Sequence, residues 1–325
     1  MARGWWRRWR GRPGAAGWLL LLLLLPALFA HLVAWDEPIL CRVNGCWHAP
    51  APAALLGLPA PGPFGRAGAR AEEILAGDPQ AVALWPLFRA GPRRTEGKGL
   101  APPSRRHPLG TDSAGRDLFA LVLHGARISL AVALLSGAAA LLLALPLGAL
   151  AGYAGGITDQ VVSRVAEVFA AFPSFFLVLA VMSWHGPGLL PLGLLLGVTR
   201  WTAIFRYVRA EFMRLKEREF VLAARALGVG PLRIMAGEIL PNAWGAVLVP
   251  LAFLLSGSVL YEAGLSWIGL GVASTTPSWG HLLKDAHHAL FHAPHLLYPP
   301  AAAIFLMTLA WNAQGEALRR RLGRG

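Results

Sequence analysis

Five histidines crowd into a short stretch near the carboxyl end and are the residues best suited to metal chemistry. They are His281, His287, His288, His292 and His295. On a helix, His288, His292 and His295 would share one face, and imidazole nitrogens bind divalent metals. Pro294 interrupts that face and Asp285 is the one carboxylate nearby. The sequence therefore favours a polar loop at the membrane interface over a metal site.

A second candidate for chemistry is the serine of Gly264-Leu265-Ser266, which has the spacing of a nucleophile motif. An intramembrane serine protease needs a histidine in a neighbouring helix to take the serine proton. The apolar stretch 296–318 has no histidine, and the five histidines before it lie outside the apolar region. A protease is the less favoured alternative.

Nucleotide and thiol chemistry find little support. The sequence has three lysines, and Gly97-Lys98-Gly99 lacks the Ser or Thr and the upstream glycine of a P-loop. The two cysteines, Cys41 and Cys46, are too few for a disulfide scaffold or a structural zinc site. We therefore expect no cofactor in this chain.

The composition indicates where the chain resides. Of 325 residues, 55% are apolar and 14% are charged, against about 25% charged in soluble domains. Residues 128–158 and 168–199 carry no charged side chain, and about 20 helical residues cross a bilayer. The chain is predicted to be an all-α polytopic membrane protein.

Six spans are predicted, at 18–35, 128–152, 161–184, 189–207, 243–262 and 296–318. Five arginines precede the first span, so the positive-inside rule predicts a cytoplasmic amino terminus. An A-x-A cleavage site is missing, which indicates an uncleaved anchor. Six crossings then bring the carboxyl terminus back to the cytoplasm.

The predicted organisation follows from these spans. A basic cytoplasmic arm (1–17) and the first span precede a periplasmic insert (36–107). A five-helix core (108–318) with a cytoplasmic loop (208–242) is followed by a basic tail (319–325). Residues 1–17, 206–238 and 319–325 hold net charges of +5, +3 and +4 of the total +13. Positive charge is thus expected on the cytoplasmic side, as an orientation signal and docking surface rather than a nucleic-acid footprint.

Within the insert, Cys41 to Trp47 is predicted to form a β-hairpin around Asn44-Gly45, because Asn-Gly suits a type I′ turn. This register pairs Val43 with Cys46 and Cys41 with His48. Both cysteines then lie diagonally on one face, which leaves a disulfide open.

The stretch from Arg209 to Asn242 is too polar to span the membrane and rich in helix formers. Gly228, Gly230 and Pro231 are predicted to separate two short helices, and Pro241 to stop the second. Either this is a rigid projection that another protein grips, or a solvated loop that only connects two spans.

At this point the sequence resembles a known family. Val221-Leu-Ala223-Ala224-Arg-Ala-Leu-Gly228, nine residues, then Glu238-Ile239-Leu240-Pro241, resembles the EAA signature of ABC importer permeases, E-A-A-x3-G-x9-I-x-L-P. Leu222 stands in place of the signature glutamate, Glu238 in place of isoleucine, and Glu219 lies nearly one turn earlier. The resemblance implies coupling to an ATPase through Glu219, Ala223, Ala224, Gly228, Glu238, Ile239 and Pro241.

Further motifs narrow the resemblance to the peptide and nickel permeases of the dipeptide/oligopeptide C-subunit type. They are His107 to Asp117, Gly125 to Leu130, Leu265 to Gly271 with Pro277 to Gly280, and Asn312, Gly315, Glu316 and Arg319. The resemblance covers about 104–322. The insert, with Trp35-Asp-Glu-Pro and Pro102-Pro-Ser-Arg105, is most similar to the microcin C peptide importer branch.

The resemblance implies a type I ABC importer permease fold and import of peptides, or of nickel or another small solute, across the inner membrane. Its implied partners are a second permease, two ATPases that bind ATP and Mg, a periplasmic binding protein and lipid. A stand-alone channel or secondary transporter is a further alternative, which would not need the loop around Gly228.

Five residues are candidates for lining the pathway or closing its gate: Arg200, Glu262, Ser266, Gly269 and Gly271. Arg200 lies about 9 Å deeper along its helix than Arg206, and either faces the pathway or, as we favour, snorkels to the inner headgroups. For Glu262, an outer gate and simple periplasmic solvation fit equally well.

Overall fold

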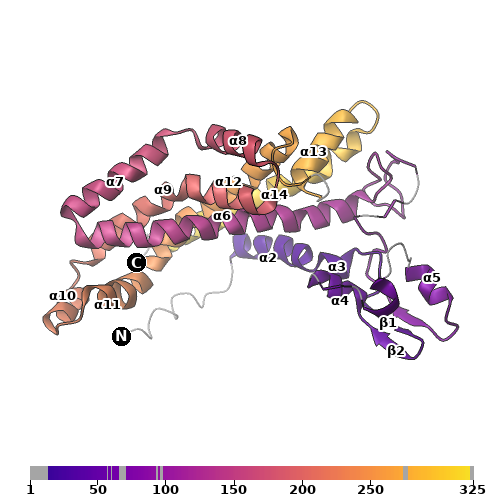
Figure 1. Cartoon of the computed structure of the whole chain (residues 1–325), viewed down its shortest axis with the longest axis horizontal. Helices are drawn as coiled ribbons and strands as arrows, with labels where there is room; N and C mark the ends of the chain where they lie inside the picture. Colours follow the sequence, from indigo (N-terminus) through magenta and orange to yellow (C-terminus); the bar gives the residue numbers. More distant parts are fainter. Residues whose placement is uncertain are drawn as a thin grey trace. The chain divides into compact units, whose positions relative to one another are not determined.

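The computed structural model describes residues 14–56, 58–59, 61–65, 71–92, 94–95, 98–273 and 277–322 (Figure 1). The chain divides into two compact units, one built mainly from Leu130–Ala273 and the other mainly from Leu21–Ser129. Most of the predicted basic arm (1–17) and the last three residues of the predicted tail lie outside the described residues.

Long helices dominate the chain. They are α6 (Leu118–Ala154), α7 (Gly156–Ala171), α8 (Ser174–His185), α9 (Leu189–Leu215), α12 (Leu240–Ile268) and α14 (Tyr298–Leu322). Between α9 and α12 lie α10 (Glu219–Ala226), α11 (Pro231–Arg233) and the π-helix η2 (Ile234–Ile239).

Small residues let α6 and α9 pack closely. A Cβ added to Gly197 of α9 would lie 2.5 Å from Ala139 Cβ, and one added to Gly152 of α6 would lie 2.7 Å from Phe212 Cβ. Glycine at such positions allows backbones to approach. Ala139 precedes Gly152 in α6, and their partners Gly197 and Phe212 follow in the same order in α9, so the two helices run parallel. Helices α7 and α8 connect them.

Among the described residues, four helical stretches are long and apolar enough to span a membrane: Leu118–Ala154, Leu189–Leu215, Pro231–Ile268 and Pro294–Leu322. The pair α7 and α8 makes a fifth span if counted as one. The predicted first span corresponds to α2 (Ala15–Leu28), whose 14 residues fall short of the usual 20. The predicted six spans thus reduce to four or five by length and composition.

The predicted continuous helix over 161–184 is wrong, because the chain bends by 75° between α7 and α8. The break falls at Phe172 and Pro173, whose backbones are extended, with ψ of 131° and 105°. Proline lacks an N–H and disfavours helical geometry in the residue before it. Figure 1 shows the two helices at a clear angle.

The prediction that Pro241 stops a helix is also wrong. Pro241 lies in the first turn of α12, which continues directly from η2. A proline inside an α-helix clashes with the carbonyl four residues earlier. The wider turns of the π-helix at 234–239 precede the proline, and the chain runs on as one helical stretch.

The other unit contains a small antiparallel sheet, which amends the all-α prediction. Its strands β1 (Leu40–Val43), β2 (Cys46–His48) and β3 (Val82–Leu84) are ordered β2-β1-β3. The predicted hairpin and register are confirmed: Asn44 and Gly45 have φ of 51° and 79°, and Cys41 pairs with His48. The unit also contains α3 (Ala30–Val33), α4 (Pro50–Leu55), η1 (Gly62–Gly65), α5 (Ala71–Ala76), α13 (Trp279–His288) and η3 (Pro294–Leu296).

Both cysteines are free thiols in this structure, with Cys41 buried and Cys46 exposed. Cys41 packs with Val43 and Phe64 in the core of the sheet. Burial and the nearby Glu37 carboxylate raise the pKa of the Cys41 thiol. The interior thiol is therefore held in its neutral, unreactive form.

The motif from His107 to Asp117 forms a loop that caps α6. Asp117 Oδ1 accepts the N–H of Ala120 at 2.9 Å, while Asp117 Oδ2 lies 2.8 Å from His107 Nδ1. Asp112 accepts a hydrogen bond from Arg116 Nε at 2.7 Å. In the same unit Trp279 Nε1 donates to the carbonyl of Val122 at 2.8 Å. These motif residues support the start of the long helix.

Candidate functional site

The turn segment, residues 219–241, has the geometry of a rigid projection. Helix α10 ends in a Schellman turn, in which Gly228 N–H bonds the Arg225 carbonyl (2.9 Å) and Val229 N–H bonds that of Ala224 (3.0 Å). Gly228 has φ +77°, and an added Cβ there would meet nothing within 4 Å. Backbone conformation alone therefore requires the glycine. The first predicted short helix and the glycine turn are confirmed, whereas the second helix runs on through η2 into α12.

One side of the turn segment is buried against the helices and the other side is exposed. Val221, Ile234 and Ile239 are fully buried in the helical core. Leu227 and Leu232 flank the turn at 83% and 77% exposure. Large apolar side chains exposed together on a projection are typical of a protein contact.

The predicted coupling residues divide between these two sides. Ile239 is buried and Ala224 packs on the core, so both anchor the segment. Ala223, Gly228, Glu219 and Glu238 are exposed. Leu222, at the position of the signature glutamate, is half exposed and lies three residues from Glu219, on the same side of α10.

Two contacts that the sequence reasoning missed tie the turn segment and its base to the helices. The guanidinium of Arg225 lies 4.9 Å from the ring centroid of Tyr153, at the end of α6. Arg209 of α9 forms a two-pronged ion pair with Asp159 of α7. Figure 1 shows α10 and α11 at the end of the helical unit where α6 turns into α7. These contacts connect α10 to α6 and α9 to α7.

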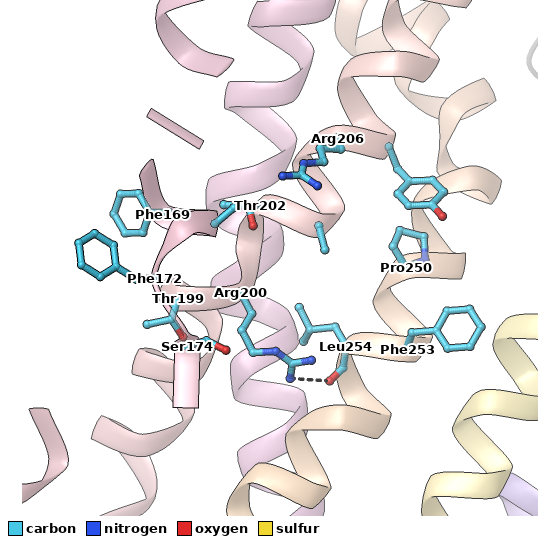
Figure 2. Close-up of a pocket in the computed structure, with 13 residues that line it drawn as sticks. Phe169, Phe172, Ser174, Thr199, Arg200, Thr202, Arg206, Pro250, Phe253 and Leu254 are labelled. Carbon is cyan, nitrogen blue, oxygen red and sulfur yellow. Dashed lines mark hydrogen bonds between the residues drawn. The ribbon is translucent and has the colours of Figure 1, made fainter. Parts of the chain in front are cut away.

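The helical unit also contains a cavity of about 390 Å³ with a mixed polar and apolar wall, here called the arginine cavity (Figure 2). Helix α9 contributes Thr199, Arg200, Thr202 and Arg206, α8 contributes Ser174, and α12 contributes Pro250, Phe253 and Leu254. Phe169 and Phe172 from the end of α7 complete one wall. The cavity thus adjoins the break between α7 and α8.

The favoured prediction that Arg200 snorkels to the inner headgroups is wrong. Its guanidinium is held by α12, with Nη1 3.4 Å from the Leu254 carbonyl oxygen and 3.3 Å from Ser258 Oγ. It also lies 4.7 Å from the ring centroid of Tyr261. Figure 2 shows its side chain reaching from α9 toward Leu254.

Glu262 and Ser266 form a buried hydrogen-bonded pair near the end of α12. Glu262 is fully buried, which excludes simple solvation of its carboxylate. Ser266 Oγ donates to Glu262 Oε1 at 2.7 Å and accepts the N–H of Val272 at 3.3 Å. The serine hydroxyl is bound by these two groups rather than by a histidine, so the geometry gives no support to a protease.

The two predicted gate glycines, Gly269 and Gly271, lie in the turn that follows Ser266. Gly269 ends α12 with φ +97°, in the left-handed region. Gly271 lies so close to Ser266 that an added Cβ would overlap its hydroxyl, and its carbonyl accepts the N–H of Gly188 at 2.9 Å. The turn is thereby fixed to the loop before α9.

The predicted histidine face is not formed, because α13 ends at His288 and leaves His292 and His295 beyond it. His295 Nε2 lies 3.2 Å from the Ala101 carbonyl oxygen. In the described part of the chain no three His, Cys, Asp or Glu side chains gather in a way that would hold a metal ion.

Comparison with known proteins identifies the family. Residues 144–325 match the family described as "Binding-protein-dependent transport system inner membrane component". The chain belongs to this family. It is therefore the permease subunit of a binding-protein-dependent ABC importer, a multi-pass protein of the inner membrane. ATP is bound by a partner ATPase, and a binding protein is the other partner.

Individual relatives agree with the family match. The permease is 35% identical to the oligopeptide transport system permease OppC of Bacillus subtilis over 221 residues, 68% of this chain and 72% of that one. It is 36% identical to the glutathione permease GsiD of Pectobacterium atrosepticum over 220 residues, 68% and 73% of the two chains. For the nickel permease NikC of Escherichia coli K12 the values are 34% over 249 residues, 75% and 84%.

A solved structure supports the fold. The inward-facing MetNI methionine ABC transporter matches with a TM-score of 0.51 at 21% identity, over 63% of this chain and 97% of that one. The permease thus has an ABC importer permease fold.

Proposed function

We propose that the permease crosses the membrane six times, with both termini in the cytoplasm. Helix α2 is separated from α3 by Phe29 alone, and together they reach from Ala15 to Val33, about the length of a span. Counting α7 and α8 as one crossing gives five more. The net positive charge of residues 206–238 and 319–325 supports cytoplasmic positions for the turn segment and the tail. The proposed organisation has a cytoplasmic arm (1–17), a periplasmic insert (36–107) and a five-helix core (108–318).

In this proposal the permease pairs with a second, homologous permease above two ATPases. ATP binding closes the ATPases and moves the turn segment, and α6, α9 and α12 change between outward-facing and inward-facing arrangements. The binding protein delivers the solute from the periplasm, and hydrolysis resets the helices. The permease itself supplies two conformations whose balance ATP shifts.

The observation that carries this proposal is the two-sided turn segment. Its buried residues fasten it to the helices, and Arg225 joins it to Tyr153 of α6. Leu227 and Leu232 are left bare beside a turn that glycine alone adopts without strain. A channel or secondary transporter has no use for such a docking device.

Peptides are the proposed solutes, by analogy with the oligopeptide and glutathione permeases. The nickel permease, which is matched over a larger share of both chains, makes nickel the alternative. Within the peptide group, the insert from Trp35 to Arg105 favours the microcin C branch.

Co-purification from the native membrane tests the assembly. A tagged permease should retain a second permease and an ATPase subunit through detergent extraction. Leu227→Asp should lower ATPase recovery at least about tenfold, because it buries a charge in an apolar contact. Leu87→Asp, at an equally exposed leucine of the insert, is the matched control and should leave ATPase recovery unchanged. Full recovery with Leu227→Asp would contradict docking at the turn.

A further inference from the structure

The arginine cavity carries positive charge that no carboxylate among the described residues neutralises. Arg200 and Arg206 both line it, and none of the described lining residues is acidic. Among the described residues neither arginine has a carboxylate within ion-pair distance. Threonine and serine hydroxyls from Thr199, Thr202 and Ser174 add polar groups to the wall.

Arg200 is held in position rather than free to leave. A Cβ added to Gly257 would lie 2.6 Å from Arg200 Nη2, so glycine makes room for the guanidinium against α12. Nη1 is occupied by the Leu254 carbonyl and Ser258 hydroxyl. Because a guanidinium has five N–H donors, those on Nε and Nη2 remain for another acceptor.

A charged side chain inside a membrane span is costly unless it serves a site. The contacts of Arg200 among the described residues are a carbonyl, a hydroxyl and an aromatic ring, which lower this cost but supply no negative charge. An arriving anion would supply the missing charge. A bare divalent cation would be repelled by both arginines.

The helix break adds a second, independent indication. Ser174, the first residue of the 12-residue helix α8, lines the cavity beside Pro173. The amino end of a helix carries partial positive charge, and interrupted helices in membranes are tolerated where they line a cavity. The hydroxyl of Ser174 lies 2.8 Å from that of Tyr261, which stacks under Arg200. One polar chain therefore connects the break to the fixed arginine.

We propose that the arginine cavity binds a carboxylate of the solute in transit, with Arg200 and Arg206 as its counter-charges. The assignment rests on the proposed import of peptides, and it makes a free carboxylate a feature that the permease itself selects. Arg200 is the fixed member of the pair, and the more exposed Arg206 receives or releases the anion toward the end of α9.

The test is uptake by the whole transporter, reconstituted in proteoliposomes with its partner permease, ATPases and binding protein. Trialanine and trialanine amide, which differ only in the terminal carboxylate, are the probes, and the readout is the ratio of their uptake rates. The same binding protein serves every variant, so its own preference cancels when ratios are compared. Arg200→Gln and Arg206→Gln each remove one positive charge, and Arg200→Lys keeps the positive charge at position 200. Arg164→Gln is the control, because it alters an exposed arginine that is paired with Glu167.

We expect the acid-to-amide ratio to fall about tenfold in Arg200→Gln, the worth of one charge-assisted hydrogen bond. It should fall also in Arg206→Gln, stay near wild type in Arg200→Lys, and be unchanged in Arg164→Gln. If the glutamine variants lose uptake of both peptides equally, so that the acid-to-amide ratio is unchanged, the carboxylate assignment is overturned while the proposed import of peptides stands. Wild-type uptake of neither probe would overturn the peptide function and the assignment with it.

A lipid phosphate is the other source of an anion, and a second set of vesicles distinguishes it. Uptake is measured in phosphatidylcholine alone and with phosphatidylglycerol added. The solute assignment predicts the same ratio in both. A ratio that changes with phosphatidylglycerol in the wild type, and no longer changes in Arg200→Gln, would assign the cavity to lipid and overturn the proposal.

Discussion

Arg200 of α9 lies with its guanidinium 4.7 Å from the ring centroid of Tyr261 on α12. The hydroxyl of the same tyrosine lies 2.8 Å from that of Ser174 on α8, and Ser258, which bonds Arg200, is 2.6 Å from Ser136 of α6. A continuous series of polar contacts thus joins the four helices α6, α8, α9 and α12.

Substitutions of Tyr261 separate the two halves of this contact. Tyr261→Phe removes the hydrogen bond to Ser174 and keeps the ring, so we expect a loss of about 1 kcal/mol in stability. Tyr261→Leu also removes the cation–π contact and should cost a further ~1 kcal/mol. Thermal unfolding of the purified permease in detergent measures both losses, and equal midpoints for the two variants would show that the ring contact contributes nothing.

Two aspartates outside the spans should give opposite responses to pH. Burial, then the Asp112 carboxylate, raises the pKa of Asp285. The folded state holds this proton more tightly than the unfolded state, so stability falls as pH rises from about 4, the ordinary aspartate value, through the raised pKa. Asp285→Asn should remove that fall.

Asp78 is the matched opposite case. The N–H groups of Asn44 and Gln80 lower the pKa of its carboxyl, with hydrogen bonds of 2.6 and 2.9 Å. The Asp78 carboxylate therefore stabilises the folded state above the ordinary aspartate pKa, and this stabilisation is lost as pH falls through the lowered pKa of the folded protein. Between pH 3 and pH 7 the melting temperature relative to wild type should therefore rise for Asp285→Asn and fall for Asp78→Asn, and a change of the opposite sign in either variant would refute the assignment for that aspartate.

The loop before α6 offers a test of helix capping. Asp117→Ala removes the acceptor for Ala120 N–H and the partner of His107, and should cost about 1 to 2 kcal/mol. Asp117→Asn keeps a capping oxygen and should recover part of that loss. Chemical unfolding of the two variants in detergent measures the difference, and an alanine variant as stable as the wild type would argue against the cap.

Features determined by residues close together in the sequence could be predicted, and features determined by contacts between distant residues could not. The hairpin around Asn44-Gly45 and the turn at Gly228 were predictable, because local residues determine such backbone conformations. β3 was missed because three residues carry no strand pattern and pair with β1 some forty residues earlier. The charge-free run 168–199 indicated a membrane segment, but hydropathy is blind to the bend at Pro173.

The direction of Arg200 was beyond sequence reasoning for a similar reason. Its position suggests snorkelling, and only the packing of α12, with Gly257 making room, turns the side chain toward Leu254. The exposed leucines of the turn segment were likewise unrecognised, because the EAA signature drew attention to its own positions.

The measurement that tests the central claim most directly is binding-protein-stimulated ATPase activity of the reconstituted transporter with Gly228→Val, against Gly230→Val as control. Gly228 has φ +77°, where a β-branched residue is strained, whereas Gly230 has φ −64° and ψ 153° with open space around it. We predict that Gly228→Val abolishes stimulated ATPase activity and uptake at a normal level of permease in the membrane, while Gly230→Val retains both. Full stimulation in Gly228→Val would contradict coupling through the turn.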